Sequence, residues 1–240
     1  MHISEEQLLR NVQAVQKANG LAPSATLVPS ISESGNEEEV FCPFNFTIEM
    51  ETGTGKTYTY IKTIYELNKL YGFRKFVVVV PSVAIREGTV KNLEITRHHF
   101  AADYANVPLL SVLYDSGKLT ELRHFAQCDA LSVLVINIDS FTKDSKEDER
   151  KSNKINQKGE MAFAPIEYIR SVHPIVIVDE PQNFETDVRR RALANLNPLC
   201  TLRYSATPKN TYNLLFSLNP VQAYDLGLVK QIEVDGVLPD

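Results

Sequence analysis

The residues best suited to chemistry form one short loop, Glu51-Thr52-Gly53-Thr54-Gly55-Lys56-Thr57. We call this segment the phosphate loop. It lies between an apolar run and a stretch with the apolar spacing of a helix. Glycine lets a backbone approach an oxyanion closely, because no Cβ blocks the approach or the unusual φ angles. The N–H groups at the start of the following helix, together with its dipole, would then bind phosphate. The pattern therefore predicts a nucleotide-binding site.

Two side chains of the phosphate loop have expected roles in binding ATP and Mg²⁺. Lys56 would place its ammonium group on the β- and γ-phosphates, and the Thr57 hydroxyl would bind Mg²⁺. The general pattern opens with glycine, whereas this chain has Met50 at that position. The alternative is a chance Gly-Thr-Gly turn, but the order strand, loop, helix is what the motif requires and favours nucleotide binding.

A second polar group, Asp179-Glu180-Pro181-Gln182, directly follows an apolar run. In open α/β sheets ligands bind beyond the carboxyl ends of the strands, so we expect these carboxylates to face the phosphate loop from one sheet position away. Asp179 would hold Mg²⁺ through water, and Glu180 would orient and deprotonate the water that attacks the γ-phosphate. The alternative is an acidic pair that caps the next helix.

A third group, Ser205-Ala206-Thr207-Pro208, follows the next apolar run. On its own such a turn means little, because hydroxyl residues are common in turns. Its weight comes from the order of the three groups along the chain, each at the end of a predicted core strand.

The elements that must position these groups alternate between strand and helix patterns. Strands are predicted at 44–50, 76–80, 108–114, 131–138, 174–178 and 199–204. Helices are predicted at 3–18, 56–71, 83–104, 118–127, 164–172 and 185–196. Continuous β-branched runs are typical of strands buried on both faces of a parallel sheet. The expected fold is therefore α/β, a doubly wound parallel sheet with right-handed crossovers.

Three segments are expected along the chain. Residues 1–40 would form an N-terminal helix and a surface connection, residues 41–220 the nucleotide-binding domain, and residues 221–240 a linker toward a further domain. Within that linker, residues 232–237 alternate like a strand but have no later partner. A polar insertion at about 142–160 is expected to be solvated or disordered, and its mixed charges argue against a nucleic-acid arm.

Composition excludes several classes of protein. The 240 residues are 43% hydrophobic and 23% charged, which is ordinary for a globular protein. The net charge of −5 argues against a nucleic-acid binder that uses its whole surface. Three widely spaced cysteines, Cys42, Cys128 and Cys200, favour neither a disulfide framework nor a zinc site. Because we find no membrane-length apolar run and no signal peptide, we expect a cytoplasmic protein without membrane contact.

The order of the three groups resembles that of superfamily 2 helicases and translocases. The form METGTGKT is more similar to the Res subunit of type III restriction enzymes, and the resemblance runs from about residue 40 to the end. The other stretches that carry it are YIKTIYELNKLYGF, FVVVVPSVAIREG, INIDSF, PIVIVDEPQNFE and LRYSATPKN. It implies the first RecA-like lobe of an ATP-dependent DNA translocase, with ATP, Mg²⁺ and double-stranded DNA as ligands and a Mod methyltransferase subunit as partner.

The resemblance also implies roles for further residues. Ser205 and Thr207 match the motif that links hydrolysis to domain movement. Pro81, Ser82 and Arg86 match the segment that touches the DNA backbone, and N–H groups, a hydroxyl and an arginine at a helix start suit a phosphate. The alternative for this segment is an ordinary strand-to-helix corner with a solvated arginine.

Some residues stay without a functional assignment. Relatives often read adenine with a glutamine near the N-terminus, and neither Gln7 nor Gln13 stands out for this role. Gln182 stands where many relatives carry His or Asp. His98-His99 are best interpreted as surface or packing histidines, because no carboxylate or cysteine lies at ligand spacing. Arg189-Arg190-Arg191 could meet DNA or a partner subunit, and a solvated helix face is the default interpretation.

Two rival functions remain open at this point. One is another superfamily 2 helicase that acts on DNA or RNA. The other is a nucleotide-switched binding module, against which Glu180 argues, because a switch needs no water-activating carboxylate. The resemblance further implies that arginines of a second lobe complete the site. We therefore expect a lobe of this kind alone to bind ATP weakly, to hydrolyse it barely, and to lack nuclease activity.

Overall fold

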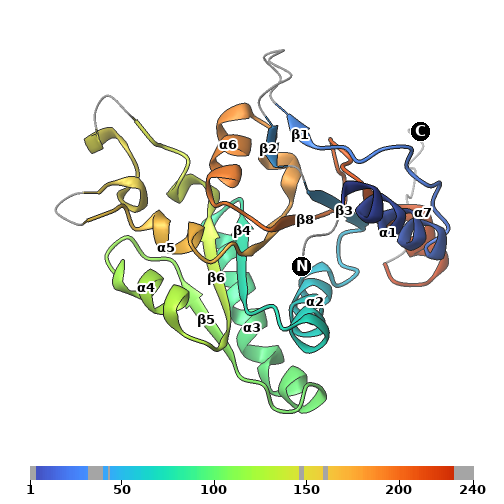
Figure 1. Ribbon diagram of the computed structural model, residues 1–240. Helices are drawn as coiled ribbons and strands as arrows, with labels where there is room; N and C mark the ends of the chain where they lie inside the picture. Colours follow the sequence, from blue (N-terminus) through green and yellow to red (C-terminus); the bar gives the residue numbers. More distant parts are fainter. Residues whose placement is uncertain (1–3, 32–39, 43, 146–148, 159–161, 230–240) are drawn as a thin grey trace, which may run out of the picture.

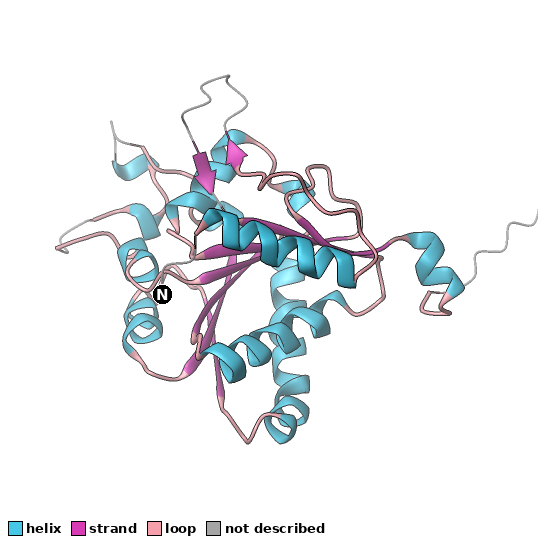
Figure 2. Ribbon diagram, turned by 45° about the vertical axis from the view of Figure 1, so that its right-hand side comes forward, coloured by secondary structure: helices cyan, strands magenta, loops and turns pink. Residues whose placement is uncertain are grey.

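A computed structural model describes residues 4–31, 40–42, 44–145, 149–158 and 162–229. Seven strands form one sheet in the order β5-β6-β4-β7-β8-β3-β9, and every neighbouring pair is parallel. Helices cover both faces of this sheet (Figures 1 and 2). The predicted doubly wound α/β fold is therefore confirmed.

The predicted strands up to residue 204 and the predicted helices are present, with boundaries shifted by a few residues. The strands of the main sheet are β3 (Asn45–Met50), β4 (Lys75–Val80), β5 (Leu109–Leu113), β6 (Leu131–Asn137), β7 (Ile175–Asp179), β8 (Cys200–Ser205) and β9 (Leu214–Leu218). The helices are α1 (Glu5–Ala18), α2 (Lys56–Tyr71), α3 (Val83–Asp103), α4 (Thr120–Gln127), α5 (Ile166–Arg170), α6 (Asp187–Asn195) and α7 (Pro220–Asp225).

Two apolar clusters hold the helices against the sheet. Alternate side chains of a strand point to opposite faces, so Val78 and Val80 of β4 join one cluster and Val77 and Val79 join the other. The first cluster includes residues of α2 and α3, and the second includes residues of α4, α5 and α6. All four valines are fully buried, which explains why β4 reads as one continuous apolar run.

Two elements near the end of the described chain were not predicted. Strand β9 pairs with β3 at the edge of the sheet, and only Leu218 of its five residues is fully buried. A strand that is half-covered lacks the long β-branched run that marks the central strands. Helix α7 occupies the first part of the segment that the sequence predicted as a linker from residue 221, and its role as a linker stays a prediction. The predicted strand at 232–237 lies outside the described residues.

The polar insertion is more ordered than predicted. Ile155 is completely buried in the second cluster, and Ser152 is also buried. The side-chain amide of Asn156 donates to the carbonyls of Phe141 and Lys143, both at 2.9 Å. Polar side chains here bond the backbone of the loop itself, so the prediction of a solvated or disordered insertion is wrong for its described residues Ser152, Ile155 and Asn156.

The N-terminal segment packs onto the edge of the sheet. Ser4 caps α1 by accepting a hydrogen bond from the Gln7 amide at 3.2 Å. Gln16 is buried, and its side-chain amide donates to the Leu214 carbonyl of β9 at 2.9 Å. The predicted surface connection contains a short antiparallel pair, β1 (Ser30–Ile31) with β2 (Val40–Cys42), and β2 lies beside α6. Among the described residues no helix combines the length and the apolar character needed to cross a bilayer.

Candidate nucleotide-binding site

The predicted site residues follow four neighbouring strands at the carboxyl edge of the sheet. In the order of the sheet, Ser82 and Arg86 follow β4, Asp179 and Glu180 end and follow β7, Ser205 ends β8, and the phosphate loop follows β3. Parallel strands all end at the same edge, so segments far apart in the sequence meet there. Because β8 lies between β7 and β3, the acidic pair is two sheet positions from the phosphate loop, not one as predicted.

The backbone of the phosphate loop needs its two glycines. Gly53 and Gly55 have φ angles of +81° and +94°, in the left-handed region that side chains rarely adopt. A Cβ added at either position would meet no atom within 4 Å, so space for a ligand lies beside the backbone. Gly55 is also the N-cap of α2, and no side chain caps this helix start. The N–H groups of the first turn are therefore available to an anion.

Hydrogen bonds anchor the first half of the phosphate loop. The Glu51 amide donates to the Leu218 carbonyl of β9 at 3.0 Å. The Thr54 hydroxyl donates to the Glu51 carbonyl at 2.6 Å, and the Thr52 amide donates to the Glu51 carboxylate at 2.8 Å. The unpredicted strand β9 thus holds the start of the phosphate loop in place.

Lys56 joins the phosphate loop to the acidic pair. Its ammonium lies 3.0 Å from the Glu180 carboxylate and 3.4 Å from the Met50 carbonyl. The Lys56 side chain is only 10% exposed and that of Glu180 is 23% exposed. Screening by water is weak at that depth, so the two charges neutralise each other effectively. Any anion that reached the phosphate loop would compete with Glu180 for this ammonium.

Asp179 has the environment of a cation ligand. It is 6% exposed, and burial together with the neighbouring Glu180 charge raises the pKa of its carboxyl to about 6, although Lys56 opposes the shift. A carboxylate that is costly to ionise in a buried site is stabilised by a nearby cation. Mg²⁺ is commonly held by one or two carboxylates with waters and phosphates. Asp179 therefore fits Mg²⁺, and Thr57, the other predicted ligand, is the second residue of α2. In the described part of the chain no group of three or more His, Cys, Asp or Glu residues is arranged to hold a metal ion.

Hydrogen bonds and an ion pair hold Glu180 in a strained backbone conformation. Its φ of 56° and ψ of 58° are left-handed, which costs a non-glycine residue about 1–3 kcal/mol. Its amide donates to the Tyr204 carbonyl of β8 at 3.0 Å. One carboxylate oxygen faces Lys56, and the other accepts from the Gln182 amide at 2.7 Å. Strain that the surroundings maintain in this way is typical of functional positions.

Gln182 connects the acidic pair to the third predicted group. Its side-chain oxygen accepts from the Ser205 hydroxyl at 2.7 Å, and the Ser205 oxygen accepts from the Thr207 amide at 3.0 Å. Ser205 is completely buried, whereas Thr207 is exposed. With the Lys56–Glu180 contact, these bonds form a continuous path that we call the relay. Sequence reasoning gave Gln182 no role. The available signal was Pro181, because a short turn there brings the residue two positions after Glu180 back beside it.

The segment predicted to touch DNA forms the corner between β4 and α3. Pro81 and Ser82 are half-buried, and the Ser82 hydroxyl caps α3 by accepting from the Ile85 amide at 3.3 Å. Arg86 pairs with Glu87 at 3.0 Å. Arg86 also lines a cavity of about 820 Å³ that continues along the edge past the ends of β6 and β5. The capping role of Ser82 fits the alternative interpretation, an ordinary strand-to-helix corner. The open cavity beside Arg86 leaves room for a ligand.

The two glutamines bond residues of the N-terminal segment, and the two histidines lie near the end of α3. Gln7 donates to the Asn11 side chain at 3.0 Å, and Gln13 donates to the Ser24 carbonyl at 2.8 Å. His98 is exposed, and His99 lies 2.7 Å from the Tyr58 hydroxyl. The surface interpretation of both histidines fits these contacts.

The three arginines of α6 are not uniformly solvated as predicted. Arg190 is 5% exposed and pairs with Asp187 at 2.7 Å, so the solvated interpretation is wrong for this residue. Arg189 pairs with Asp139 at 3.0 Å. The helical spacing places successive residues on different faces, and the middle arginine faces inward.

A buried ion pair that the sequence did not reveal lies close to the relay in the chain. Arg203 of β8 is 2% exposed and pairs with Glu185, which follows the acidic pair. Asn210 donates to the second oxygen of Glu185 at 2.7 Å, and the Arg203 guanidinium lies 4.9 Å from the centre of the Tyr212 ring. These contacts tie together the segments that follow β7 and β8.

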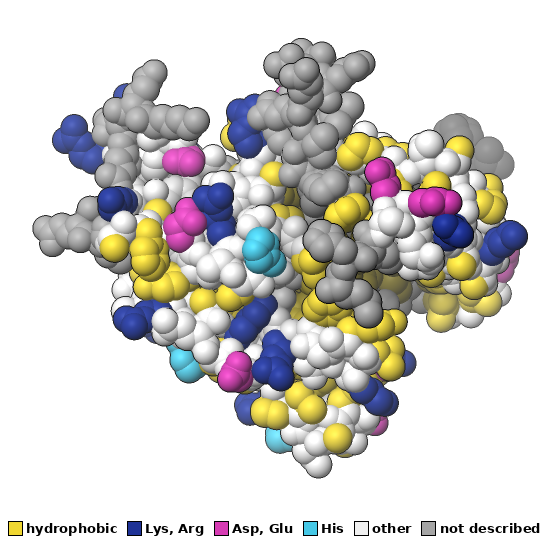
Figure 3. Space-filling view, viewed as in Figure 1, with side chains coloured by type: hydrophobic (Ala, Val, Ile, Leu, Met, Phe, Trp, Pro, Cys, Tyr) yellow, Lys and Arg dark blue, Asp and Glu magenta, His cyan; other side chains and the backbone are white. Residues whose placement is uncertain are grey.

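Surface charge is mixed in sign. On the face shown in Figure 3, basic and acidic side chains are interspersed with apolar ones. With a net charge of −5, the chain would need a local site for nucleic acid, such as the edge near Arg86.

Comparisons with known proteins point to one family and one fold. A family model described as "Type III restriction enzyme, res subunit" matches residues 6–210. The Res subunit of the type III restriction-modification enzyme EcoP15I from Escherichia coli is 32% identical over 97% of this chain and 24% of its own length. The Res subunit of EcoPI from Escherichia phage P1 is 29% identical over the same shares.

Among solved structures, a nuclease-deletion mutant of the type ISP restriction-modification enzyme LlaGI, in complex with a DNA substrate mimic, matches with a TM-score of 0.50. It covers 95% of this chain and 21% of that one at 14% identity, so the likeness concerns the fold alone. The chain spans about a quarter of the length of the curated relatives. With a matching family model over most of its residues, the chain belongs to the family of type III restriction enzyme Res subunits.

Proposed function

We propose that this chain is the ATP-binding motor lobe of an ATP-dependent DNA translocase that forms part of a type III restriction enzyme. The relay carries this proposal. It joins a lysine that suits phosphate, a carboxylate that suits water activation, and the Ser-Ala-Thr segment, all at one edge of a parallel sheet. A lobe that bound a nucleotide without hydrolysing it would not need hydrogen bonds that connect the site to the Ser-Ala-Thr segment.

Nucleotide binding rests on the phosphate loop. The backbone of residues 52–55 and the first turn of α2 would surround the β- and γ-phosphates, and Lys56 would turn its ammonium from Glu180 toward them. Thr57 and Asp179 would hold Mg²⁺, which supplies positive charge that neutralises the phosphates.

Glu180 would act as the base for the attacking water. In the structure one of its oxygens is occupied by Lys56. When the phosphates attract Lys56, that oxygen becomes free to accept a proton from water, while Gln182 keeps the other oxygen in place. Binding of ATP thereby creates the free base that its hydrolysis requires.

Ser205 and Thr207 would transmit a movement of the Glu180 carboxylate toward a neighbouring domain. A shift of the Glu180 carboxylate moves the Gln182 amide, which moves the Ser205 hydroxyl and the amide of Thr207. The exposed Thr207 stands where a neighbouring domain can contact it. The segment 81–86 and the cavity beside Arg86 would contact the backbone of double-stranded DNA, next to β7 in the sheet.

A second lobe and a partner subunit are proposed because the chain belongs to the family of Res subunits. A second RecA-like lobe would supply arginines that are typically worth about 10³–10⁵ in rate. A Mod methyltransferase subunit would recognise the DNA sequence. This lobe alone would therefore bind Mg-ATP weakly and hydrolyse it near background, without stimulation by DNA.

The test compares steady-state ATP hydrolysis by this chain with that by a full-length Res–Mod complex containing the same lobe, each with and without DNA. We expect DNA-stimulated turnover in the complex and near-background turnover in the lobe. Turnover by the lobe at the rate of the complex would contradict the two-lobe site. ATP binding without DNA stimulation in the complex would favour the nucleotide-switched binding module.

A further inference from the structure

Arg189 of α6 connects the turn that follows Glu180 to the wall of the cavity beside Arg86. Its guanidinium donates one hydrogen bond to the Asn183 carbonyl at 2.6 Å and another to the Asp139 carboxylate at 3.0 Å. Asp139 follows β6 and lines the cavity. The two bonds come from different nitrogens of one planar group, so a movement that changes one bond changes the geometry of the other.

On the side of the acidic pair, Arg189 supports the end of a short turn. The turn Pro181–Asn183 begins after Glu180, and the Asn183 amide donates to the Glu180 carbonyl at 3.1 Å. The last carbonyls of a helical turn lack a partner within it, and Arg189 supplies one for Asn183. The guanidinium thus holds the far end of the turn, while Glu180 occupies the strained position at its start.

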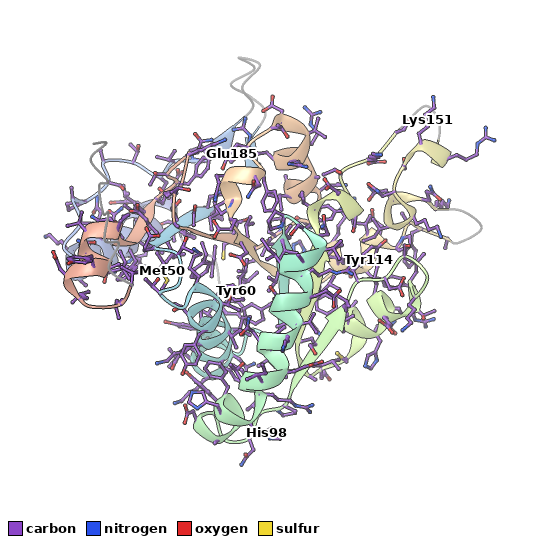
Figure 4. The ribbon with its side chains drawn as sticks, turned by 180° about the vertical axis from the view of Figure 1, so that it is seen from behind. Met50, Tyr60, His98, Tyr114, Lys151 and Glu185 are labelled. Carbon is purple, nitrogen blue, oxygen red and sulfur yellow. The ribbon has the colours of Figure 1, made fainter. Side chains whose placement is uncertain are left out.

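On the other side, the cavity has the size and the groups to take a phosphate. Its volume is about 820 Å³, and Tyr114 lines it directly after β5 (Figure 4). The polar insertion contributes as well, because Asn153, another lining residue, donates to the Asp139 carbonyl at 3.1 Å. The charged side chains of the lining are two cations and two carboxylates: Arg86, Lys154, Asp115 and Asp139.

The Asp139–Arg189 pair is weak enough for such a phosphate to disturb. The Asp139 side chain is 63% exposed and that of Arg189 is 35% exposed, and exposed ion pairs contribute little stability. A phosphate held by Arg86 or Lys154 would share the cavity with the Asp139 carboxylate. The two negative charges would repel each other, and both would attract the Arg189 guanidinium. Binding of DNA in the cavity would therefore alter the pair at little cost.

We propose that Arg189 is a positioning residue through which DNA in the cavity acts on Glu180. A phosphate in the cavity alters the Asp139–Arg189 pair, and Arg189 transmits the change through the Asn183 carbonyl to the turn that follows Glu180. This inference rests on the proposed function, because it needs a lobe that binds both ATP and DNA. The relay leads from Glu180 toward Ser205, and Arg189 adds a connection from Glu180 toward the cavity.

The experiment measures how strongly DNA and nucleotide affect each other's binding in a full-length Res–Mod complex that contains this lobe. A non-hydrolysable ATP analogue with Mg²⁺ is titrated by calorimetry, with and without saturating double-stranded DNA. The ratio of the two affinities is the coupling factor, which is typically about 5–150-fold between linked sites. We expect Arg189→Gln to reduce this factor about fivefold. A purely structural role would lower thermal stability and would change both affinities equally, which leaves the factor unchanged.

Asp139→Asn tests the same connection from the side of the cavity. It removes the charge that pairs with Arg189 and keeps the size of the side chain, so the coupling factor should fall to a similar extent. In the double variant the factor should fall no further than in either single variant, because residues that act through one contact are not additive. Independent roles would instead give a fall equal to the product of the two single effects.

Arg74→Gln is the matched control. Arg74 pairs with Asp129 at 3.5 Å, and this exposed pair lies just before β4 and β6, at the opposite edge of the sheet from the cavity. The control should leave the coupling factor unchanged. If Arg189→Gln fails to fold, Asp139→Asn decides the question, because it changes an exposed side chain.

The outcomes separate this inference from the function on which it rests. If the unmodified complex binds no ATP analogue, or if DNA does not stimulate its ATP hydrolysis, the proposed function fails and this inference fails with it. If DNA stimulates hydrolysis but does not change the affinity for the analogue, the inference is overturned and the proposed function stands. The inference is also overturned if either Arg189→Gln or Asp139→Asn keeps the original coupling factor, if their effects multiply, or if Arg74→Gln lowers the factor equally.

Discussion

Two regions meet across the candidate site, and they are built in opposite ways. The phosphate loop offers backbone N–H groups around Gly53 and Gly55, with open space beside both glycines. Across from it, Glu180, Gln182 and Ser205 are bonded to one another by side chains at 2.7 Å. The phosphate loop has unblocked N–H groups and space for an anionic ligand from solvent. In the second region the side chains are bonded to one another, and the proposed mechanism has them respond when Lys56 turns from Glu180 toward the phosphates.

This difference determines which substitutions each region can tolerate. A region that binds through its backbone depends on conformation and on the one side chain that supplies charge. A region that works through paired side chains depends on the chemical identity of each partner, because an unpaired buried polar group is costly. Four substitutions test this contrast.

The largest effect is expected at Glu180, in the bonded region. Glu180→Gln keeps the size of the side chain but removes the base, so turnover in the full-length complex with DNA should fall by roughly 10²–10⁴-fold. Mg-ATP affinity should be kept, because the carboxylate acts on water. Steady-state hydrolysis and calorimetry measure the two properties. Glu121→Gln on the surface of α4 is the matched control. Equal losses of affinity and turnover would mean that Glu180 is structural.

The next effect concerns the ion pair near the relay. Glu185→Gln removes the carboxylate that pairs with the buried Arg203, and hydrogen bonds to charged groups typically contribute about 1.5–3 kcal/mol. We expect the free energy of unfolding to fall by about that amount in chemical denaturation. Glu167→Gln removes the partner of an exposed arginine pair and should change stability by less than about 1 kcal/mol. Similar losses in both variants would show that burial adds nothing to the Arg203 pair.

Lys56 tests the open region. Lys56→Ala should weaken ATP binding roughly 10–100-fold, because a charge-assisted hydrogen bond contributes about 1.5–3 kcal/mol. The variant should remain folded, since glycine conformation and the Glu51–Leu218 bond hold the loop without the lysine. Calorimetric titration of ATP measures the change, and Lys62→Ala on the exposed face of α2 is the control. Unchanged affinity in a folded Lys56→Ala protein would remove the phosphate-loop assignment.

The smallest effect is expected from cutting the relay in its middle. Gln182→Ala removes the bonds to Glu180 and Ser205. ATP affinity should stay within about twofold, while DNA-stimulated turnover in the full-length complex should fall about fivefold, as the loss of roughly 1 kcal/mol predicts. Asn183→Ala, which removes a bond to the Glu180 carbonyl only, is the neighbouring control. A larger loss of affinity than of turnover would place Gln182 in binding instead of coupling.

Much of the fold could be predicted from the sequence because its central strands are chemically simple. Strand β4 is buried on both faces and reads as an unbroken apolar run, and the glycines of the phosphate loop indicate their own backbone conformation. Local patterns therefore located the strand ends and the residues beyond them.

The features that were missed depend on neighbours that a local pattern does not contain. Strand β9 is a half-covered edge strand that pairs with one strand only, β3. Arg190 and Arg203 look like surface charges until Asp187 and Glu185 are placed beside them. Gln182 has a role only once β8 brings Ser205 next to it, and the position of β8 between β7 and β3 follows from the order of strands in the sheet.

The position of β3 in the sheet determines how late during synthesis this strand can pair with its neighbours. Its two neighbours are β8 and β9, and the Thr47 backbone of β3 pairs with Tyr212, 165 residues farther along the chain. At about 5–20 residues per second, a ribosome needs on the order of 10–30 s to add that many residues. During this interval β3 has left the ribosome but has no strand to pair with, and the Leu218 carbonyl that anchors the phosphate loop does not yet exist. The nascent chain therefore remains without its candidate nucleotide-binding site until nearly all of the described lobe has been made.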